Sequence, residues 1–428
     1  MLFFAGMVSD PHPLMLIPFA LMLASIALMP FLNHHWWERF LPAVASSLAA
    51  ICAGYYLLIL KNGMRMADVA HEYISFIALV GSLYIVAGGI HIRVKGESTP
   101  LRNCLFLLVG AVIANIVGTT GASMLMIRPW IRMNRYRVTG FHIVFFIFIV
   151  SNIGGCLTPI GDPPLFLGYL KGVPFWWVFQ NCWRAWLVGV FALLAVFFIL
   201  DRRNFLRAPE KVRELETSQE QWRFDGLANI AFILVILGAI FLPPWIRETA
   251  MLLAAVGSYF GTSKAIHQSN HFTFEPIKEV AWLFIGIFAT MVPALDYLEL
   301  HAHSLGIQSE TQYFWFTGVL SGLLDNAPTY LAFLATAFGM AGLSLDDPGQ
   351  MDQFLALHDR QLLAISIGAV FFGAFTYIGN GPNFMVKSIA QQSGIKMEGF
   401  LGYLAKYSLP ILLPLFILVS LLFFSRWP

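Results

Sequence analysis

The stretch Ser151–Pro164 reads SNIGGCLTPIGDPP and lies inside a segment that is otherwise apolar from about Phe141 onward. Its glycines and prolines cannot all belong to one regular helix, because proline removes a backbone donor and clashes with the preceding turn. A carboxylate, Asp162, lies among them. Within a bilayer, broken backbone and a carboxylate are tolerated only where they are buried in protein or line a wet cavity. The stretch therefore predicts an ion or substrate site inside a membrane protein.

The composition of the chain agrees with a membrane protein. Of its 428 residues, 58% are hydrophobic and only 12% are charged, whereas a soluble domain carries about 25% charged residues. The four cysteines are scattered, and their spacing fits neither a zinc site nor a disulfide framework. The net charge of +2 comes without a basic patch interleaved with aromatic residues, so no nucleic-acid partner is expected. We expect an all-α polytopic protein in the lipid bilayer that is not an enzyme and has no cofactor.

Segments of about 20 mostly apolar residues are long enough to span a bilayer. The chain offers twelve such segments or near matches, at roughly 13–32, 41–60, 73–90, 103–127, 141–170, 183–200, 226–244, 249–262, 277–297, 312–338, 361–386 and 406–425. No Lys or Arg precedes the first of them, so it is predicted to be a retained span and not a signal peptide. The polar stretch 201–225 is predicted to be a solvated cytoplasmic linker between two halves.

The distribution of Lys and Arg predicts the topology, since cytoplasmic loops carry an excess of both. Three basic clusters stand out: Arg93, Lys95 and Arg102; Arg128, Arg132, Arg135 and Arg137; and Arg202, Arg203, Arg207, Lys211 and Arg213. If the segment 103–127 crossed the bilayer, its two flanking clusters would lie on opposite sides. A re-entrant hairpin places all three clusters in the cytoplasm and both termini in the periplasm. The alternative is a plain helix whose small residues pack against a neighbour.

The second half of the chain resembles the first. TPIGDPPLF (158–166) aligns with TYIGNGPNF (376–384) at a constant offset, so that Asp162 faces Asn380. Both stretches follow a hairpin candidate, at about 103–127 and about 312–338, and both break an apolar segment, at about 141–170 and about 361–386. We therefore predict two repeats, 1–200 and 226–428, each with about five transmembrane helices and one hairpin. The odd number of spans inverts the second repeat, and discontinuous helices at the midplane are typical of secondary transporters.

Polar side chains cluster at the four predicted helix breaks. Asp162 and Asp325 are the carboxylates, and either could bind sodium and a proton in turn or serve as a structural cap. The neutral oxygen ligands or donors predicted to complete the ion or substrate site are Thr119, Thr120, Ser123, Asn152, Thr158, Asn326, Thr329, Thr376, Asn380 and Asn383. Asn115 belongs to the same polar set. Taken singly, each of these could equally make a hydrogen bond between helices.

Four stretches together resemble the ion transporter superfamily: GTTGASMLMIRP (118–129), SNIGGCLTPIGDPP (151–164), SGLLDNAPT (321–329) and TYIGNGPNF (376–384). That group holds bacterial sodium/proton antiporters, arsenite permeases and sodium-coupled citrate or dicarboxylate carriers. The resemblance implies that the hairpin tips and unwound helices form the site, that the protein lies in the bacterial inner membrane, and that it is a homodimer. Dicarboxylate carriers show a Ser-Asn-Thr signature at both tips, which this chain lacks.

We predict a secondary active transporter, with the sodium/proton antiporter branch as the first expectation, because two site carboxylates suit small cations and repel a citrate anion. The alternative is a sodium- or proton-coupled carrier of citrate, a dicarboxylate or another anion, including one of the arsenite type. An intramembrane aspartyl protease would also need two aspartates, but it requires Gly-x-Gly-Asp, and here Pro159 stands two residues before Gly161.

Overall fold

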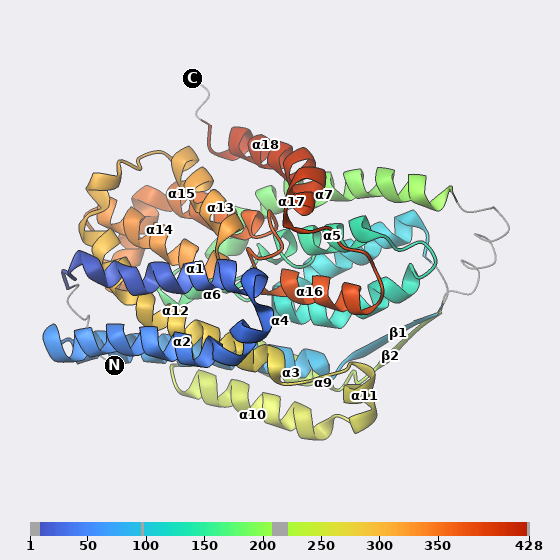
Figure 1. The fold of residues 1–428 in the computed structure, drawn as a ribbon, viewed down its shortest axis with the longest axis horizontal. Helices are drawn as coiled ribbons and strands as arrows, with labels where there is room; N and C mark the ends of the chain where they lie inside the picture. Colours follow the sequence, from blue (N-terminus) through green and yellow to red (C-terminus); the bar gives the residue numbers. More distant parts are fainter. Residues whose placement is uncertain (1–8, 96–97, 208–220, 426–428) are drawn as a thin grey trace.

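The computed structural model describes residues 9–95, 98–207 and 221–425. Most of the helices lie roughly along one direction, which is horizontal in Figure 1. Seven helices in the described part of the chain are long and apolar enough to cross a membrane: Arg39–Ile59, Gly63–Gly88, Pro100–Met133, Phe175–Phe205, Glu275–Leu300, Gly349–Phe372 and Phe400–Phe423. The predicted class, an all-α polytopic membrane protein, is confirmed.

The helices are α1 (Leu16–Leu32), α2 (His34–Gly54), α3 (Gly63–Gly88), α4 (Pro100–Met133), α5 (Gly140–Ile149), α6 (Pro163–Leu170), α7 (Phe175–Phe205), α9 (Asn229–Ala239), α10 (Ile246–Gly261), α11 (Lys264–Ser269), α12 (Glu275–Leu300), α13 (Glu310–Leu323), α14 (Asn326–Met340), α15 (Pro348–Phe372), α16 (Gly381–Gln392), α17 (Phe400–Tyr403) and α18 (Leu413–Phe423). Two strands, β1 (His91–Lys95) and β2 (Gln221–Asp225), form an antiparallel ribbon. Short turns of 3-10 helix lie at Pro13–Met15, Ile153–Gly155 and Ala302–Leu305, and π-helical turns at Tyr55–Ile59 and Leu404–Leu412.

Helix α4 folds back on itself. Gly118 has φ +76° and ψ 157°, a conformation outside the helical region. In a straight helix Gly110 and Met126 would lie about 24 Å apart, yet a Cβ added at Gly110 would lie 3.3 Å from the Met126 sulfur. The chain therefore reverses at Gly118, and its two arms, 100–117 and 119–133, lie side by side. Whether this hairpin is re-entrant in the bilayer stays a prediction.

The two predicted unwound segments, between α5 and α6 and between α15 and α16, contain no α-helix, and the first includes the 3-10 turn Ile153–Gly155. A Cβ at Gly161 would strike the Gly155 carbonyl, and one at Gly379 would lie 2.9 Å from the Gly373 carbonyl. These two glycine pairs occupy matching positions in the sequence alignment of the halves. The shared contacts agree with an internal repeat, which itself stays a prediction.

The linker predicted over 201–225 has regular secondary structure at both of its described ends, although most of the residues there are exposed, as predicted. Its first five residues complete α7, where Asp201 is fully buried, and its last five form β2. The alternation of polar and apolar residues in QWRFD (221–225) matches that in HIRVK (91–95), which is the two-residue period of a strand. The middle of the linker, with Lys211 and Arg213, lies outside the described residues.

Candidate functional site

Asp162 lies at the centre of the polar interior. Its side chain is 1% exposed. One carboxylate oxygen accepts hydrogen bonds from the Thr119 hydroxyl at 2.7 Å and from the Asn380 amide at 2.9 Å, and the other accepts from the Asn326 amide at 2.6 Å. The donors come from the tip of the α4 hairpin and from the starts of α14 and α16, so the structure brings four of the predicted site residues into direct contact.

These four residues also mark the beginnings of four helices. Asp162 is the N-cap residue of α6 and Asn380 that of α16, Asn326 is the first residue of α14, and Thr119 begins the second arm of α4. The dipole of a helix makes its N-terminus partly positive, but α6 begins with Pro163 and Pro164, which have no N–H donor, and the Thr119 N–H is already bonded to the Gly161 carbonyl. The convergence of four helix N-termini still gives this region a positive potential, which favours anions.

The two unwound segments are tied together behind Asp162. The Asn152 amide donates to the Asn383 side-chain oxygen at 2.7 Å, and the Asn383 amide donates to the carbonyls of Gly373 at 2.8 Å and Thr376 at 3.1 Å. The Asn380 amide, besides binding the carboxylate, lies 3.2 Å from the Asn152 oxygen. Buried side-chain amides therefore join the two unwound segments directly.

Two predicted residues hold the start of α14. Asp325 is 8% exposed and caps the helix, because its carboxylate accepts from the backbone N–H of Ala327 at 2.9 Å. Thr329 donates its hydroxyl to the Asp325 carbonyl at 2.8 Å. Asp325 therefore has the structural role of a helix cap, which was one of the two alternatives predicted from the sequence. It directly precedes Asn326 in the chain, and the Asn326 amide binds Asp162.

Three further predicted residues brace the hairpin and the unwound segments. Thr158 donates its hydroxyl to the Asn115 carbonyl at 2.7 Å, and Thr376 donates to the carbonyl of Gly322 in the same way, also at 2.7 Å. Ser123 lies 2.8 Å from the Ser151 hydroxyl. These contacts hold the backbone that carries the site, and none of the three side chains has a hydrogen bond with Asp162 among those described.

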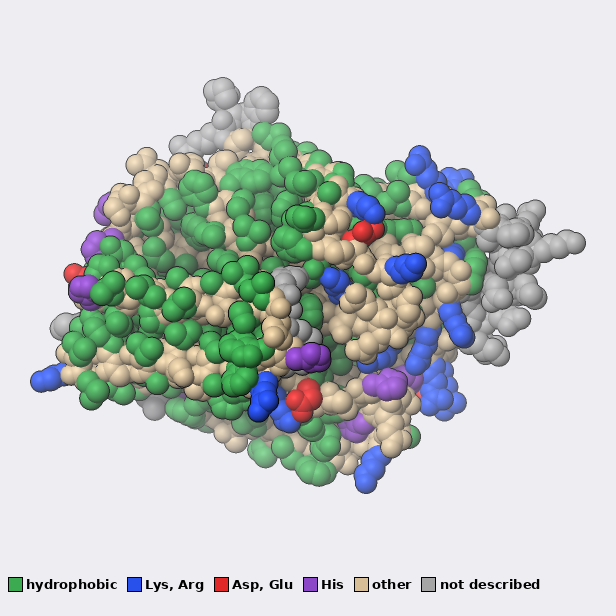
Figure 2. Space-filling model, in the orientation of Figure 1, with side chains coloured by type: hydrophobic (Ala, Val, Ile, Leu, Met, Phe, Trp, Pro, Cys, Tyr) green, Lys and Arg blue, Asp and Glu red, His purple; other side chains and the backbone are tan. Residues whose placement is uncertain are grey.

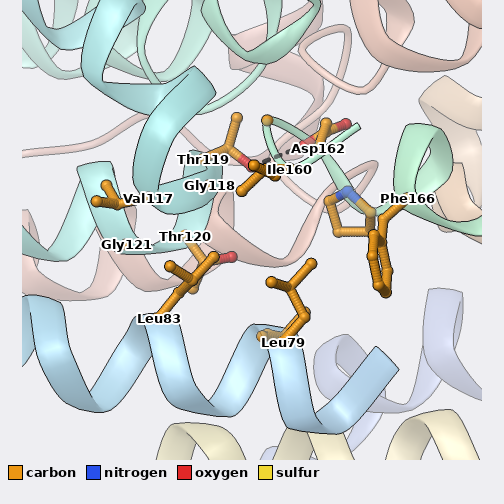
Figure 3. A pocket seen from close by; sticks show the side chains of 13 residues that line it. Leu79, Leu83, Val117, Gly118, Thr119, Thr120, Gly121, Ile160, Asp162 and Phe166 are labelled. Atoms are coloured by element: carbon orange, nitrogen blue, oxygen red, sulfur yellow. Dashed lines mark hydrogen bonds between the residues drawn. The ribbon is translucent and has the colours of Figure 1, made fainter. Parts of the chain in front are cut away.

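Beside Asp162 the protein leaves a small hollow, which Figure 3 shows from close by. The hollow is lined by the hairpin tip, including Thr120, by the backbone around Gly161, and by Leu79 and Leu83 of α3. Its volume is about 20 Å³, which is room for about one water molecule. The wall made by α3 is apolar, whereas the opposite wall carries the site carboxylate.

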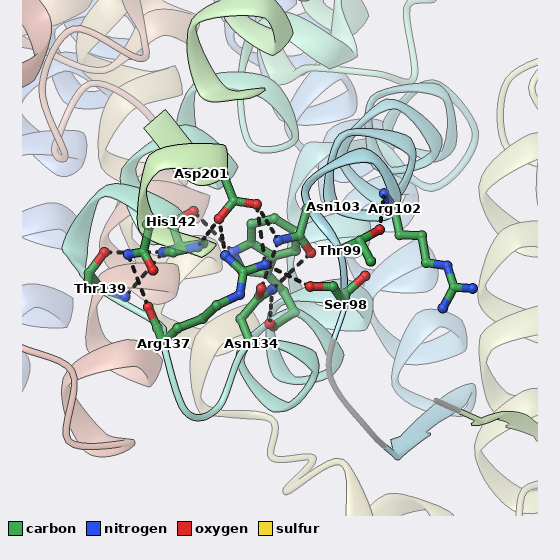
Figure 4. A network of polar contacts seen from close by, with 11 residues as sticks. Ser98, Thr99, Arg102, Asn103, Asn134, Arg137, Thr139, His142 and Asp201 are labelled. Atoms are coloured by element: carbon green, nitrogen blue, oxygen red, sulfur yellow. Dashed lines mark hydrogen bonds and ion pairs between the residues drawn. The ribbon is translucent and has the colours of Figure 1, made fainter. Parts of the chain in front are cut away.

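A second polar cluster, not predicted from the sequence, closes the base of the hairpin (Figure 4). Arg137 donates to both carboxylate oxygens of Asp201, and one of these oxygens also lies 3.0 Å from His142 Nε2. The other oxygen accepts from the Asn103 amide at 2.7 Å, and Asn103 also bonds Asn134. His142 belongs to this cluster, and none of its described hydrogen bonds reaches Asp162.

A third cluster lies at the other end of α6. The Lys171 ammonium lies 2.8 Å from a carboxylate oxygen of Glu72 and 2.8 Å from one of Asp346. Arg65 joins Asp346 at 2.6 Å to Asp296 at 2.7 Å. Burial alone would raise the pKa of Asp346, but Lys171 and Arg65 hold that pKa at about 2. The far end of α6 is therefore fixed by buried ion pairs.

Comparison with known proteins yields one family and two relatives. A model of the family described as "Putative citrate transport" matches residues 9–424, nearly the whole chain. The two relatives, from Mycobacterium bovis and Mycobacterium tuberculosis, are each described as an uncharacterized transporter. Each is 25% identical over 319 residues, which cover 70% of this chain and 72% of the relative.

Proposed function

Because this chain belongs to the citrate transport family that it matches over residues 9–424, we propose that it carries citrate or a related small carboxylate across the membrane, coupled to a cation. The comparisons give no support to the sodium/proton antiport that was the first expectation from the sequence, and the alternative fits them better. Sodium as the coupling ion, the homodimer, the inner-membrane location and the periplasmic termini are further parts of this proposal, carried over from the sequence.

The observation that carries the proposal is the set of four helix N-termini around Asp162. The sequence argued against an organic anion because two site carboxylates would repel it. The dipoles of these N-termini act against the negative charge of Asp162 and Asp325. A polyanion entering such a site needs an accompanying cation for charge balance, and the carboxylates are suited to bind it. Helix N-termini and carboxylates side by side therefore favour coupled entry of an anion and a cation.

The size of the hollow adds a requirement for movement. A space of about 20 Å³ is too small for a tricarboxylate, so substrate entry requires the hairpin tip to separate from the wall made by α3. Separation there breaks apolar contacts, whereas the hydrogen bonds of Asp162 with Asn326 and Asn380 keep the broken helices together. We infer that the hairpin and the broken helices move as a unit during alternating access.

The test is uptake of radiolabelled citrate into liposomes that contain the purified protein, with an inward sodium or proton gradient. The variant is Asp162→Asn, which keeps the shape of the side chain and removes its charge. The matched control is Asp352→Asn, because Asp352 is exposed on α15. We expect gradient-driven uptake in the wild type and the control, and loss of coupled uptake in Asp162→Asn while the variant stays folded.

Two results would contradict the proposal. Citrate uptake that is absent under every gradient, together with sodium-induced collapse of an imposed pH gradient, would return the protein to the antiporter class. Uptake that is unchanged in Asp162→Asn would show that the substrate and coupling ion bind elsewhere.

A further inference from the structure

The ribbon of β1 and β2 projects from the end of the molecule where α3 finishes and α9 begins (Figure 1). Its root is fixed by the amide of the buried Asn229 and by that of the half-buried Asn270. Asn229 donates to the carbonyls of Gly89 at 2.9 Å and Gly226 at 3.1 Å, and Asn270 donates to the Ile90 carbonyl at 2.8 Å. Since the root is bonded to the carbonyls of Gly89 and Ile90, the ribbon is held at the end of α3, a helix long and apolar enough to cross a membrane.

One face of the ribbon is apolar. Directly opposite residues share a face, so the pairs Ile92 with Phe224 and Val94 with Trp222 lie together. Trp222 is 39% exposed and Phe224 49% exposed, and their rings are close to parallel with centroids 6.4 Å apart. Aromatic side chains at this level of a membrane protein lie among the lipid headgroups.

The other face of the ribbon is basic. Arg93 and Arg223 are directly opposite each other, an arrangement of like charges that destabilises a strand pair. Asp225 lies 2.6 Å from the Arg93 Nε and 3.1 Å from the Arg223 Nε, so one carboxylate serves two guanidinium groups. The arginine side chains are 54% and 74% exposed. This face therefore keeps a net positive charge and guanidinium donors open to an anion.

The surroundings of the ribbon are basic as well, and Figure 2 shows Lys and Arg side chains gathered toward this end. The exposed arginines at the nearby ends of α4 and α7 are Arg102, Arg132, Arg135, Arg202, Arg203 and Arg207. An apolar aromatic face backed by a basic face is the pattern of elements that lie in the plane of the interface and bind anionic lipids.

We propose that the β1–β2 ribbon is a binding element for anionic phospholipid. Trp222 and Phe224 enter the boundary between headgroups and acyl chains, and Arg93 and Arg223 bind the lipid phosphate through their guanidinium groups. The exposed arginines around the ribbon supply positive charge that complements the lipid phosphate, and the fixed root determines how deeply the ribbon enters the interface. This inference does not depend on which substrate the protein carries.

The ribbon is also connected to the substrate site. The Trp222 ring lies 5.8 Å from that of Phe106 on the first arm of the hairpin, and Phe106 stacks at 5.5 Å on Trp130 of the second arm. A lipid that orders the ribbon therefore also steadies both arms of the hairpin whose tip holds Thr119. Bound lipid should raise the thermal stability of the protein as well as remain attached to it.

The experiment uses the full-length protein in a neutral detergent, titrated with phosphatidylglycerol, with phosphatidylcholine, and with inorganic phosphate. Bound lipid is counted by native mass spectrometry, and the unfolding temperature is recorded in parallel. The test variant is Arg93→Gln with Arg223→Gln, and the matched control removes two other exposed arginines, Arg39→Gln with Arg184→Gln. A third variant, Arg93→Lys with Arg223→Lys, keeps the charge if the first fails to fold.

We expect phosphatidylglycerol to bind and stabilise the wild type and the control, and to bind the glutamine double variant about 30-fold more weakly. The lysine double variant should bind more tightly than the glutamine variant. Equal effects of phosphatidylglycerol and phosphatidylcholine on the wild type would overturn the proposal. So would equal losses in the test and control variants, or stabilisation by inorganic phosphate that matches that by phosphatidylglycerol, since the site would then recognise a soluble anion.

Discussion

Replacement of Gly118 by alanine should destabilise the protein and disturb its site at the same time. The φ of +76° with ψ of 157° belongs to a region that is essentially restricted to glycine, and holding another residue there costs about 1–3 kcal/mol. The new Cβ would in addition lie 3.3 Å from the Ile160 carbonyl, a tight contact with the unwound segment. The next residue, Thr119, donates its backbone N–H to the Gly161 carbonyl at 2.8 Å and its hydroxyl to Asp162. A change in the backbone at Gly118 would therefore displace Thr119 from both partners.

The matched control is Gly54→Ala. Gly54 has the helical φ of −59°, and a Cβ there would meet no atom within 4 Å. Alanine at such a position should stabilise the helix by about 0.5–1 kcal/mol. The two variants should therefore change stability in opposite directions, with a difference of about 1.5–4 kcal/mol between them. Because the two expected changes in stability have opposite signs, a general destabilisation caused by any glycine-to-alanine substitution could not produce both.

The assay is thermal unfolding of each purified variant in the same detergent, followed by citrate uptake in liposomes. We expect Gly118→Ala to unfold below the wild type and Gly54→Ala at or above it. Uptake should fall in Gly118→Ala even at temperatures where that variant is fully folded, because Thr119 is displaced. Unfolding of Gly118→Ala at or above the temperature of Gly54→Ala would refute the claim that the hairpin depends on a left-handed glycine.

Three other predictions concern buried contacts, each measured as the unfolding temperature in detergent. Ion pairs that outweigh its burial lower the pKa of Asp346 from 3.8 to about 2. The ionised carboxylate therefore contributes on the order of 2 kcal/mol to the free energy of unfolding above pH 4, and this contribution is lost as the pH falls toward 2. Asp346→Asn should lose less stability between pH 4 and pH 2 than the wild type, and an equal loss would contradict the pairing. Asp201→Asn should cost about 3–5 kcal/mol because Arg137 is left buried without its carboxylate, and adding Arg137→Met should recover part of that loss. Gly168→Ala should cost about 1–3 kcal/mol, since the new Cβ would overlap the Tyr330 hydroxyl, and Tyr330→Phe in the same chain should reduce the cost.

The breaks in the helices could be predicted from the sequence because their causes are local. Proline and glycine determine where a helix ends, whatever the rest of the chain does. Asp162, Asn326 and Asn380 were therefore predicted as site residues from their positions at breaks, and the structure joins all three. The sequence could not predict which of these side chains bond to one another, since the Asn326 amide binds a carboxylate 164 residues away.

The buried ion pairs escaped prediction for a related reason. Asp201 begins a run rich in charged residues, and composition alone favours a solvated loop there. Its burial depends on Arg137, which lies 64 residues earlier in the chain, because a charge enters the interior only with a partner. The ribbon was missed because it is made of two five-residue pieces, each too short to be distinguished from a loop until its partner strand is known.

Helix α6 connects the polar site around Asp162 to the buried ion pairs around Lys171. It has eight residues, with Asp162 at its start and Lys171 immediately after its end, so a rigid helix of about 12 Å joins the site to the buried pairs with Glu72 and Asp346. Glu72 lies on α3, the helix that also forms the apolar wall of the hollow. If the broken helices move away from that wall to admit substrate, the bond from Lys171 to Glu72 must lengthen with them. The ion pairs therefore oppose opening, and an open state must replace the pair between Lys171 and Glu72 with other contacts, because a buried charge left without a partner is costly.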